Sequence, residues 1–365
     1  MRLVTSSLLF AVVSILLVIS VAGEPRVPKV PAIYVFGDST ADVGNNNYLP
    51  GKNAKANFPH YGIDFPESRP TGRFSNGYNG IDFLAIHMGF RRSPPPYLSL
   101  TNKTSHQILK GLRGVSFASG GSGILDSTGP TTIIMSKQIE YFATLRSEIL
   151  TRLDAAKASF LFSKSIFFIS SGGNDVFALF SQNQTLNTTG IQLFVNTLVS
   201  KYENHVKNLY NMGARKFAIT NVAPIGCLPV SRRSSPTGEC IDAMNAVSKG
   251  VNDAIAALFS KLSSELQGLK YSIGSSYDLI LSLVASPNTV GLEEVKNACC
   301  GGGKFNAETG CTPNSTYCSN RNRFVFWDAV HPTQATSKLV GFVFYNGSPQ
   351  FAAPINYKQL VEGGY

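Results

Sequence analysis

Short apolar runs rich in β-branched and aromatic residues alternate along this chain with longer stretches of helical periodicity. We expect strands at residues 32–38, 114–119, 165–173, 216–222 and 270–276. We expect helices at residues 79–88, 137–163, 190–212, 241–266 and 332–344. The strand candidates are apolar on both faces, which is typical of strands buried in a parallel sheet. The alternation predicts an α/β fold: a three-layer α/β/α sandwich with a central parallel sheet.

The first 23 residues have the layout of a secretory signal peptide. Arg2 supplies a positive charge, an uncharged apolar run extends from Leu8 to Ala22, and the small Gly23 precedes a polar residue. A retained membrane anchor is the alternative, but the run is short for a bilayer span of about 20 residues. We therefore expect cleavage near Gly23 and no stable membrane insertion. No break in composition divides residues 24–365, so we expect them to form one domain.

Two further features fit export. Five sequons could carry N-linked glycans, at Asn102, Asn183, Asn187, Asn314 and Asn346. Six cysteines lie in the C-terminal half, at Cys227, Cys240, Cys299, Cys300, Cys311 and Cys318. In an oxidising compartment an even number predicts up to three disulfides, with the pairing left open. Zinc is the alternative, but no histidine lies among these cysteines, and we expect no metal site.

The charge of the chain bears on its partners. It has 32 Lys and Arg against 22 Asp and Glu, a formal net charge of +10. The basic residues are dispersed, with pairs such as Arg91-Arg92 and Arg232-Arg233 but no long run. No nucleic-acid-binding motif accompanies them, so we expect no nucleic-acid partner. A solvated basic surface explains the excess, and weak attraction to an acidic cell-wall polysaccharide is the sharper alternative.

Residues suited to acyl transfer follow the ends of the strand candidates. Ser39 follows the first strand, Gly120 and Gly121 follow the second, and Asn174 follows the third. Ligands of open parallel sheets bind beyond the carboxyl ends of the strands, so these residues should converge. Near the C-terminus, Asp328 and His331 precede a proline that can start a helix.

The chemistry of these residue types predicts their roles. A serine hydroxyl becomes a nucleophile when a base, usually histidine, takes its proton, and a carboxylate orients that histidine. We expect Ser39 to be the nucleophile, His331 the base and Asp328 its partner. None of the other histidines is beside a strand end with a carboxylate: they are His60, His87, His106 and His205.

The negative oxygen of a tetrahedral intermediate needs preorganised donors. The backbone N–H of Ser39, that of Gly121 or Gly120, and the side-chain amide of Asn174 could supply them. Each feature alone has a structural explanation, such as a tight turn at the glycines or a helix cap at Asn174. Their joint placement at strand ends favours a single site.

Four segments carry these residues: FGDSTADVGNNN, GVSFASGGSGIL, SSGGNDV and DAVHPT. They resemble the four conserved blocks of plant GDSL esterases/lipases, a branch of the SGNH hydrolase superfamily. The similarity extends from about Ala32 to about Tyr345 and includes TGRFSNG, NVAPIGCLP and NACCGGG. One position departs from the family name, because Thr40 stands where that name has leucine; we attach no chemical consequence to it.

The resemblance implies a flavodoxin-like SGNH hydrolase fold, with Ser39, Asp328 and His331 as catalytic residues. It makes Gly121 the glycine donor, with Gly120 as the alternative, and Asn174 the amide donor. We expect a secreted, extracellular serine esterase or lipase, in the cell wall or apoplast, that needs no cofactor. Its substrate would be a small-molecule or polymeric carboxylic ester, cleaved through an acyl-enzyme.

Two other functions fit the same residues. One is acyl transfer to a sugar or lipid hydroxyl at the same site. The other is a secreted binding glycoprotein without turnover, which the complete set of catalytic residues disfavours. A Gly-x-Ser-x-Gly elbow does not occur in the sequence, which argues against a lipase of the α/β-hydrolase type.

Overall fold

The structure is a computed structural model that describes residues 27–101, 105–181 and 187–363. The predicted signal peptide and the sequon residues Asn102 and Asn183 lie outside these ranges. The strands are β1 (Ile33–Gly37), β2 (Ile166–Ser170), β3 (Lys216–Thr220), β4 (Lys270–Gly274), β5 (Glu294–Ala298), β6 (Cys300–Gly301), β7 (Thr316–Tyr317), β8 (Phe324–Phe326) and β9 (Ala352–Ala353). The helices are α2 (Gly80–His87), α3 (His106–Leu109), α4 (Met135–Leu150), α5 (Ala155–Lys164), α6 (Gly173–Ser181), α7 (Thr188–Asn211), α8 (Pro229–Arg232), α9 (Asp242–Glu265), α10 (Ser276–Ala285), α11 (Gln334–Asn346) and α12 (Tyr357–Glu362).

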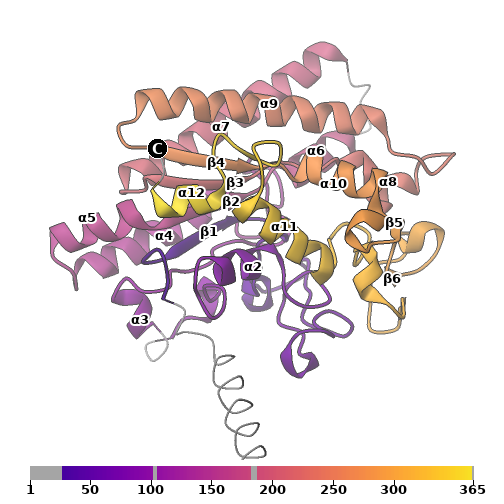
Figure 1. Ribbon diagram of the computed structural model, residues 1–365, viewed down its shortest axis with the longest axis horizontal. Coiled ribbons are helices and arrows are strands. Elements are labelled where there is room, and N and C mark those ends of the chain that lie inside the picture. The colour runs from indigo at the N-terminus through magenta and orange to yellow at the C-terminus, as the bar shows by residue number, and fades with distance from the viewer. Residues whose placement is uncertain (1–26, 102–104, 182–186, 364–365) are drawn as a thin grey trace, which may run out of the picture.

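The central sheet has the order β1-β2-β3-β4-β9. The strands β1 to β4 run parallel in continuous register, and the two-residue β9 pairs antiparallel with the end of β4. Figure 1 shows the sheet in the middle of the molecule with helices on both sides. This arrangement confirms the predicted three-layer α/β/α sandwich, and four of the five expected strands are β1 to β4.

The fifth expected strand, at residues 114–119, is not continuous. The Val35 N–H donates to the Val115 carbonyl at 3.0 Å, and the segment runs parallel to β1, but only isolated bridges form. Two features keep this segment from forming a regular strand. Gly114 has a φ of +80°, and on the side away from β1 the segment pairs with Pro96, which has no N–H to donate to a strand ladder. The segment still lies beside β1, so the spatial order is that of a flavodoxin-like sheet.

Aromatic packing joins the sheet to its helical layers. A row of aromatic residues crosses the four parallel strands in register: Tyr34, Phe167, Phe217 and Tyr271. The ring of Tyr34 lies 5.0 Å from that of Phe142 in α4, and the ring of Phe217 lies 6.2 Å from that of Phe259 in α9. Toward the opposite layer, the Tyr357 hydroxyl of α12 donates to the Ile219 carbonyl at 2.6 Å. Every residue of β1 and β2 is buried, as the sequence pattern predicted, whereas β4 is partly exposed.

The prediction of a single helix at residues 137–163 is wrong, because this stretch forms two helices. Helix α4 ends at Leu150, and α5 begins after Asp154. Asp154 has extended backbone angles, and its carboxylate accepts the Lys157 N–H at 2.8 Å, as the N-cap of a new helix does. The other four expected helices correspond to α2, α7, α9 and α11. Helices α6 and α10, which follow β2 and β4, were not expected.

Three disulfides pair all six cysteines: Cys227–Cys240, Cys299–Cys318 and Cys300–Cys311. This settles the pairing that the sequence left open and leaves no cysteine for the zinc alternative. The last two disulfides take part in a second, smaller core, whose other buried members are Ala56, Tyr61, Phe74 and Trp327. The Cys300 N–H donates to the Trp327 carbonyl at 2.7 Å, so this core directly contacts the chain that leads to Asp328.

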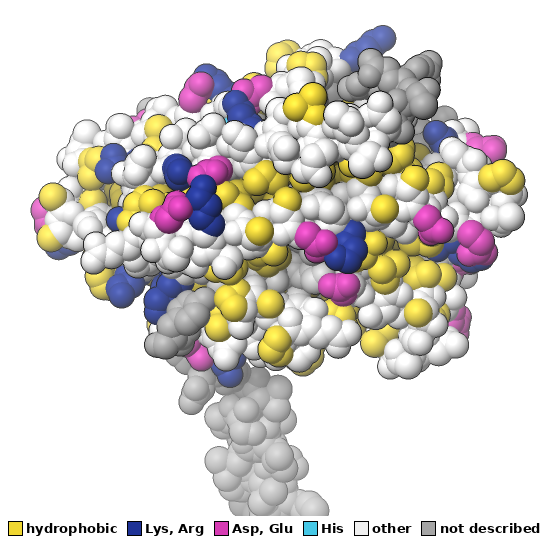
Figure 2. Space-filling model, turned by 90° about the horizontal axis from the view of Figure 1, so that it is seen from above, with side chains coloured by type: hydrophobic (Ala, Val, Ile, Leu, Met, Phe, Trp, Pro, Cys, Tyr) yellow, Lys and Arg dark blue, Asp and Glu magenta, His cyan; other side chains and the backbone are white. Residues whose placement is uncertain are grey.

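The charged side chains are dispersed over the surface, as the sequence predicted. Figure 2 shows Lys and Arg side chains interspersed with Asp and Glu on the face it presents. On the helices α7 and α9, for example, Glu203 pairs with both Lys207 and Lys261. The described sequon residues Asn187, Asn314 and Asn346 are all exposed. None of the helices in the described part of the chain is long and apolar enough to cross a membrane.

Candidate active site

Ser39 lies in a tight turn directly after β1. Gly37, at the end of that strand, has a φ of +139° and packs so closely on β2 that a Cβ there would lie 2.0 Å from the Ser170 carbonyl oxygen. The buried Asp38 carboxylate accepts the Thr40 N–H at 2.9 Å and the Thr40 hydroxyl at 2.8 Å. The same hydroxyl lies 2.8 Å from the Ser170 hydroxyl. The Thr40 hydroxyl therefore helps to hold the turn, which a leucine side chain could not do and which the sequence did not lead us to expect.

The hydroxyl of Ser39 meets the imidazole of His331. Ser39 Oγ lies 2.7 Å from His331 Nε2, although 292 positions separate the two residues. His331 Nδ1 lies 2.8 Å and 2.9 Å from the two carboxylate oxygens of Asp328. The backbone N–H groups of Val330 and His331 also donate to Asp328 Oδ1, which fixes the carboxylate within its turn. The structure thus brings together the three residues that the sequence singled out.

A fourth side chain, Tyr61, reaches this group and was missed by the sequence analysis. Its hydroxyl donates to Asp328 Oδ2 at 2.7 Å, and its side chain is buried. Tyr61 comes from the long loop after β1, 267 positions before Asp328. Neither a motif nor a periodicity of the loop could have indicated this contact, because only the docking of the loop creates it.

The charges of the buried pair stabilise each other. Burial alone would lower the pKa of His331, but the charge and hydrogen bond of Asp328, with the charge of Asp38, raise it above the ordinary value of 6.5. Burial alone would raise the pKa of Asp328, but His331 and the Tyr61 hydrogen bond hold it below the ordinary value of 3.8. Asp328 is therefore ionised near neutral pH and His331 is a stronger base than an exposed histidine. This combination suits proton transfer from a serine.

The two candidate glycine donors differ in their hydrogen bonds. The Gly120 N–H donates to Asp42 Oδ2 at 3.0 Å and is therefore already used. Within the described ranges, neither the Gly121 N–H nor the Ser39 N–H donates a hydrogen bond. Gly121 also has a φ of +91°, which favours glycine at this position. The hydrogen bonds thus favour Gly121 over Gly120 as a donor to a ligand.

Asn174 and Asp175 tie the glycine loop to the start of α6. Asn174 Nδ2 donates one hydrogen bond to the Ser122 carbonyl at 2.8 Å, which leaves its second amide hydrogen for a ligand. The Asp175 carboxylate accepts the N–H groups of Ile124 and Leu125 at 2.8 and 3.0 Å. These contacts hold the loop and the amide in fixed relation before any substrate binds.

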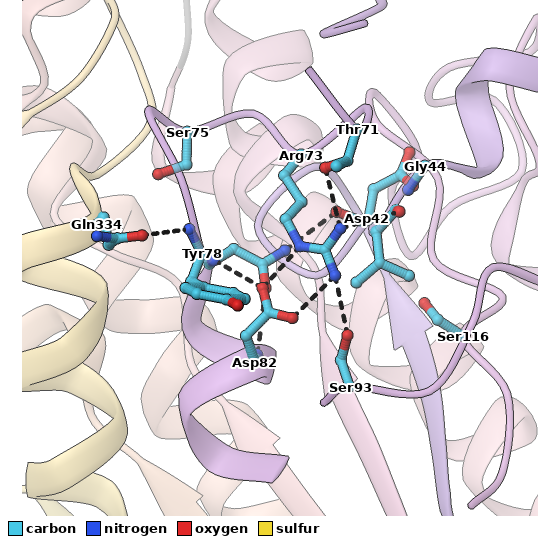
Figure 3. A network of polar contacts seen from close by, with 12 residues as sticks. Asp42, Gly44, Thr71, Arg73, Ser75, Tyr78, Asp82, Ser93, Ser116 and Gln334 are labelled. Carbon is cyan, nitrogen blue, oxygen red and sulfur yellow. Dashed lines mark hydrogen bonds and ion pairs between the residues drawn. The ribbon is translucent and has the colours of Figure 1, made fainter. Parts of the chain in front are cut away.

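The loop that follows β1 is anchored by a buried ion pair (Figure 3). Arg73 donates to both carboxylate oxygens of Asp82 in α2, at 2.7 and 2.8 Å, and to the Ser93 hydroxyl at 2.9 Å. A second link joins the loop to α11, because Gln334 Oε1 accepts the Tyr78 N–H at 2.7 Å. The buried ion pair thus ties the loop to helix α2, and removing one of its partners would leave the other charge buried and unpaired.

A cavity of about 150 Å³ opens beside Ser39 and Asn174. Most of its walls are apolar, with contributions from Leu84, Phe168, Phe177, Val222, Ile225, Ile280, Phe326, Val330 and Val340. It extends over the carboxyl ends of β1, β2 and β3, where parallel sheets bind ligands. In the described ranges, no three His, Cys, Asp or Glu side chains are grouped so that they could hold a metal ion. The cavity offers an apolar space next to the serine hydroxyl.

The chain is similar in sequence to a known protein family. The family model described as GDSL-like Lipase/Acylhydrolase matches residues 33–342. Three GDSL esterases/lipases of Arabidopsis thaliana, At5g55050, At4g16230 and At2g42990, are each 36% identical to this chain. The alignments cover 93%, 91% and 90% of this chain, and 92%, 91% and 93% of the respective relatives.

Solved structures resemble this one much more weakly. An α/β hydrolase from the metagenome of Lake Arreo, Spain, aligns over 88% of this chain and 96% of its own. The TM-score is 0.37 and the sequence identity 11%, a likeness too low to bear on the function of this chain.

Proposed function

The chain belongs to the GDSL-like lipase/acylhydrolase family and is a carboxylic ester hydrolase, and we propose that it cleaves its ester through an acyl-enzyme on Ser39. One observation carries this proposal. The Ser39 hydroxyl lies 2.7 Å from His331 Nε2, while Asp328 holds the other ring nitrogen. A hydroxyl in such contact can lose its proton as it attacks a carbonyl carbon.

The proposed reaction has two balanced steps. In the first, His331 Nε2 accepts the Ser39 proton, Oγ bonds to the carbonyl carbon, and the alcohol leaves with the proton returned by His331. In the second, His331 takes a proton from water, whose oxygen attacks the acyl-enzyme, and Ser39 leaves with that proton. Asp328 keeps the imidazole in the tautomer with hydrogen on Nδ1 and stabilises its protonated form.

The negative oxygen of each tetrahedral intermediate would be bound by three donors. These are the N–H groups of Ser39 and Gly121 and the second amide hydrogen of Asn174. The unused state of these donors in the described residues supports the assignment. Donors that are already fixed cost no reorganisation when charge develops.

The apolar cavity favours the acyl part of the substrate as its occupant. Its walls carry apolar side chains such as Phe177, Ile225 and Ile280, and it opens at Ser39, where the carbonyl carbon must lie. Burying each methylene of an acyl chain contributes roughly 0.8 kcal/mol. We therefore infer that the substrate is an ester of an aliphatic or similarly apolar acid.

A covalent probe tests the assignment of Ser39. We expect a fluorophosphonate to abolish hydrolysis of p-nitrophenyl butyrate, and peptide mapping by mass spectrometry to place the adduct on the peptide that contains Ser39. Protein that is denatured before labelling should remain unmodified there, because the reaction needs the assembled site. An adduct confined to another serine, with activity lost, would contradict the assignment.

We also infer that the protein is exported through the secretory pathway. Three disulfides and exposed sequon residues at Asn187, Asn314 and Asn346 support this, because disulfides persist in oxidising compartments. Expression of the full chain in a secreting plant host tests it. We expect the protein in the medium, with an N-terminus close to Glu24 and N-linked glycan on at least one of the three asparagines. Retention of an intact N-terminus in the membrane fraction would favour the anchor alternative.

A further inference from the structure

We propose that Tyr61 is a positioning residue that holds Asp328, and through it His331, in the geometry needed for hydrolysis. The inference rests on the function proposed above. Tyr61 donates to Asp328 Oδ2, the oxygen that lies 2.8 Å from His331 Nδ1. The backbone donors from Val330 and His331 both bind the other oxygen, Oδ1. Within the described residues, Tyr61 is thus the only donor besides the imidazole that fixes Oδ2.

The phenol itself is held rigidly by aromatic packing. The Tyr61 ring lies 5.2 Å from Phe58 and 6.2 Å from Phe74, both in edge-to-face geometry, and 6.4 Å from Trp327. Trp327 directly precedes Asp328, and Phe74 also lies 5.0 Å from the His331 ring. One cluster of rings therefore contacts both members of the acid–base pair. A donor whose own position is fixed by packing can orient its partner, whereas a mobile donor cannot.

Two ion pairs connect the loop of Tyr61 to the surrounding fold. Asp64 accepts two hydrogen bonds from Arg321, at 2.6 and 2.8 Å, close to the chain segment that leads to Asp328. Arg73 is joined to Asp82 of α2 by the buried pair shown in Figure 3. The loop that carries Tyr61 is therefore attached to helix α2 on one side and to the segment that leads to Asp328 on the other.

Tyr61 acts through Asp328 and does not line the cavity beside Ser39. Its loss should therefore reduce the rate of the chemical step and leave substrate binding unchanged. Burial and the Asp328 charge raise the pKa of Tyr61 well above its ordinary value, so the phenol keeps its hydrogen across the neutral range in which the acid limb is measured. Its donor role is thus independent of pH over that range.

The phenol also affects the charge that His331 experiences. Two carboxylates raise the pKa of His331, those of Asp328 and Asp38. The Tyr61 hydrogen offsets part of the Asp328 charge, so removing it strengthens the negative potential at the imidazole. The pKa of His331 should then rise, and because the neutral imidazole is the active form, the acid limb of kcat/KM should move to higher pH.

The Tyr61→Phe variant of the full chain tests this inference, since it removes only the hydroxyl. With p-nitrophenyl butyrate we expect kcat on the neutral plateau to fall about tenfold with KM unchanged. The acid limb of kcat/KM should move upward in pH. The rate constant for labelling Ser39 with a fluorophosphonate should fall by a similar factor, because it reports activation of the same hydroxyl.

Tyr357→Phe is a matched control. Tyr357 is also buried and donates its hydroxyl, at 2.6 Å, to a backbone carbonyl, but it lies in α12 and outside the cavity. We expect it to lower the melting temperature about as much as Tyr61→Phe while kcat and the pH profile stay at wild-type values. The positioning role would be overturned if Tyr61→Phe kept the wild-type kcat. It would also be overturned if both variants lost kcat equally while their pH limbs stayed unchanged. Hydrolysis by Ser39→Ala above about one-hundredth of the wild-type rate would instead overturn the proposed function.

Discussion

Replacement of Ser39 by alanine is expected to lower kcat for p-nitrophenyl butyrate by about 10⁵- to 10⁶-fold. The variant lacks the oxygen that lies 2.7 Å from His331 Nε2, so no acyl-enzyme can form. The remaining donors and the cavity could still bind the substrate and stabilise attack by water, which leaves a small residual rate. Steady-state kinetics with freshly prepared enzyme, compared with the spontaneous hydrolysis rate, measures the effect.

The fold of this variant should be unaffected, because Ser39 is partly exposed and, among the described residues, its hydroxyl hydrogen-bonds only to the imidazole. We expect a change in unfolding free energy of less than about 0.5 kcal/mol. Ser263→Ala, on the exposed side of α9, is a suitable control and should keep wild-type activity. Residual hydrolysis above about one-hundredth of the wild-type rate in Ser39→Ala, from protein purified free of host esterases, would contradict a nucleophilic role.

Replacement of Asp328 by asparagine should lower kcat/KM by about 10⁴-fold. The asparagine oxygen can still accept the backbone N–H groups of Val330 and His331, so its amide nitrogen must face His331 Nδ1 and the Tyr61 hydroxyl. A donor at that place favours the tautomer with hydrogen on Nε2, which cannot accept the Ser39 proton. The nearly isosteric change should leave the circular dichroism spectrum unchanged.

The pH profile separates this electrostatic effect from a loss of structure. In the wild type the pKa of His331 is raised above 6.5. The acid limb of kcat/KM should therefore have its midpoint above pH 6.5, and kcat/KM should fall tenfold for each pH unit below that midpoint. Without the carboxylate, burial dominates and the pKa of His331 should decrease, so the limb of the residual activity should move to lower pH. Asp253→Asn, which removes an exposed carboxylate paired with Lys249 on α9, should change neither the plateau nor the limb. An Asp328→Asn variant with more than a tenth of wild-type activity would exclude the assigned role.

Much of the fold could be predicted because it depends on local patterns. Apolar residues on both faces identified β1 to β4, and the helical periodicity identified α2, α7, α9 and α11. The errors arose where one residue overrides the pattern. Asp154 starts a new helix inside a continuous periodicity, and the run that begins at Gly114, whose φ is +80°, forms only isolated bridges to β1.

The sequence also indicated that Ser39, Asp328 and His331 form one site. The position of Ser39 at a strand end pointed to it, whereas Asp328 and His331 were indicated by their residue types and by the family resemblance, because they follow β8, which lies outside the central sheet. The residues alone left Gly120 and Gly121 both open, and only the family resemblance favoured Gly121. The structural reason depends on Asp42, whose carboxylate accepts the Gly120 N–H. The sequence could not choose the disulfide pairing, which depends on how the segment from Cys299 to Cys318 folds back on itself.

The amino-acid sequence by itself determined the layers, the strands and the residue types suited to acyl transfer, because periodicity and strand-end chemistry act over a few neighbouring positions. Tertiary structure alone decided which backbone N–H remains free and that Tyr61 contacts Asp328. These contacts join residues 78 and 267 positions apart, and the second forms only when the loop after β1 packs its rings against Trp327 and the two disulfides behind it. The physical reason is that the energy of these contacts comes from burial and from donor geometry in the assembled core, neither of which exists in a local stretch of chain.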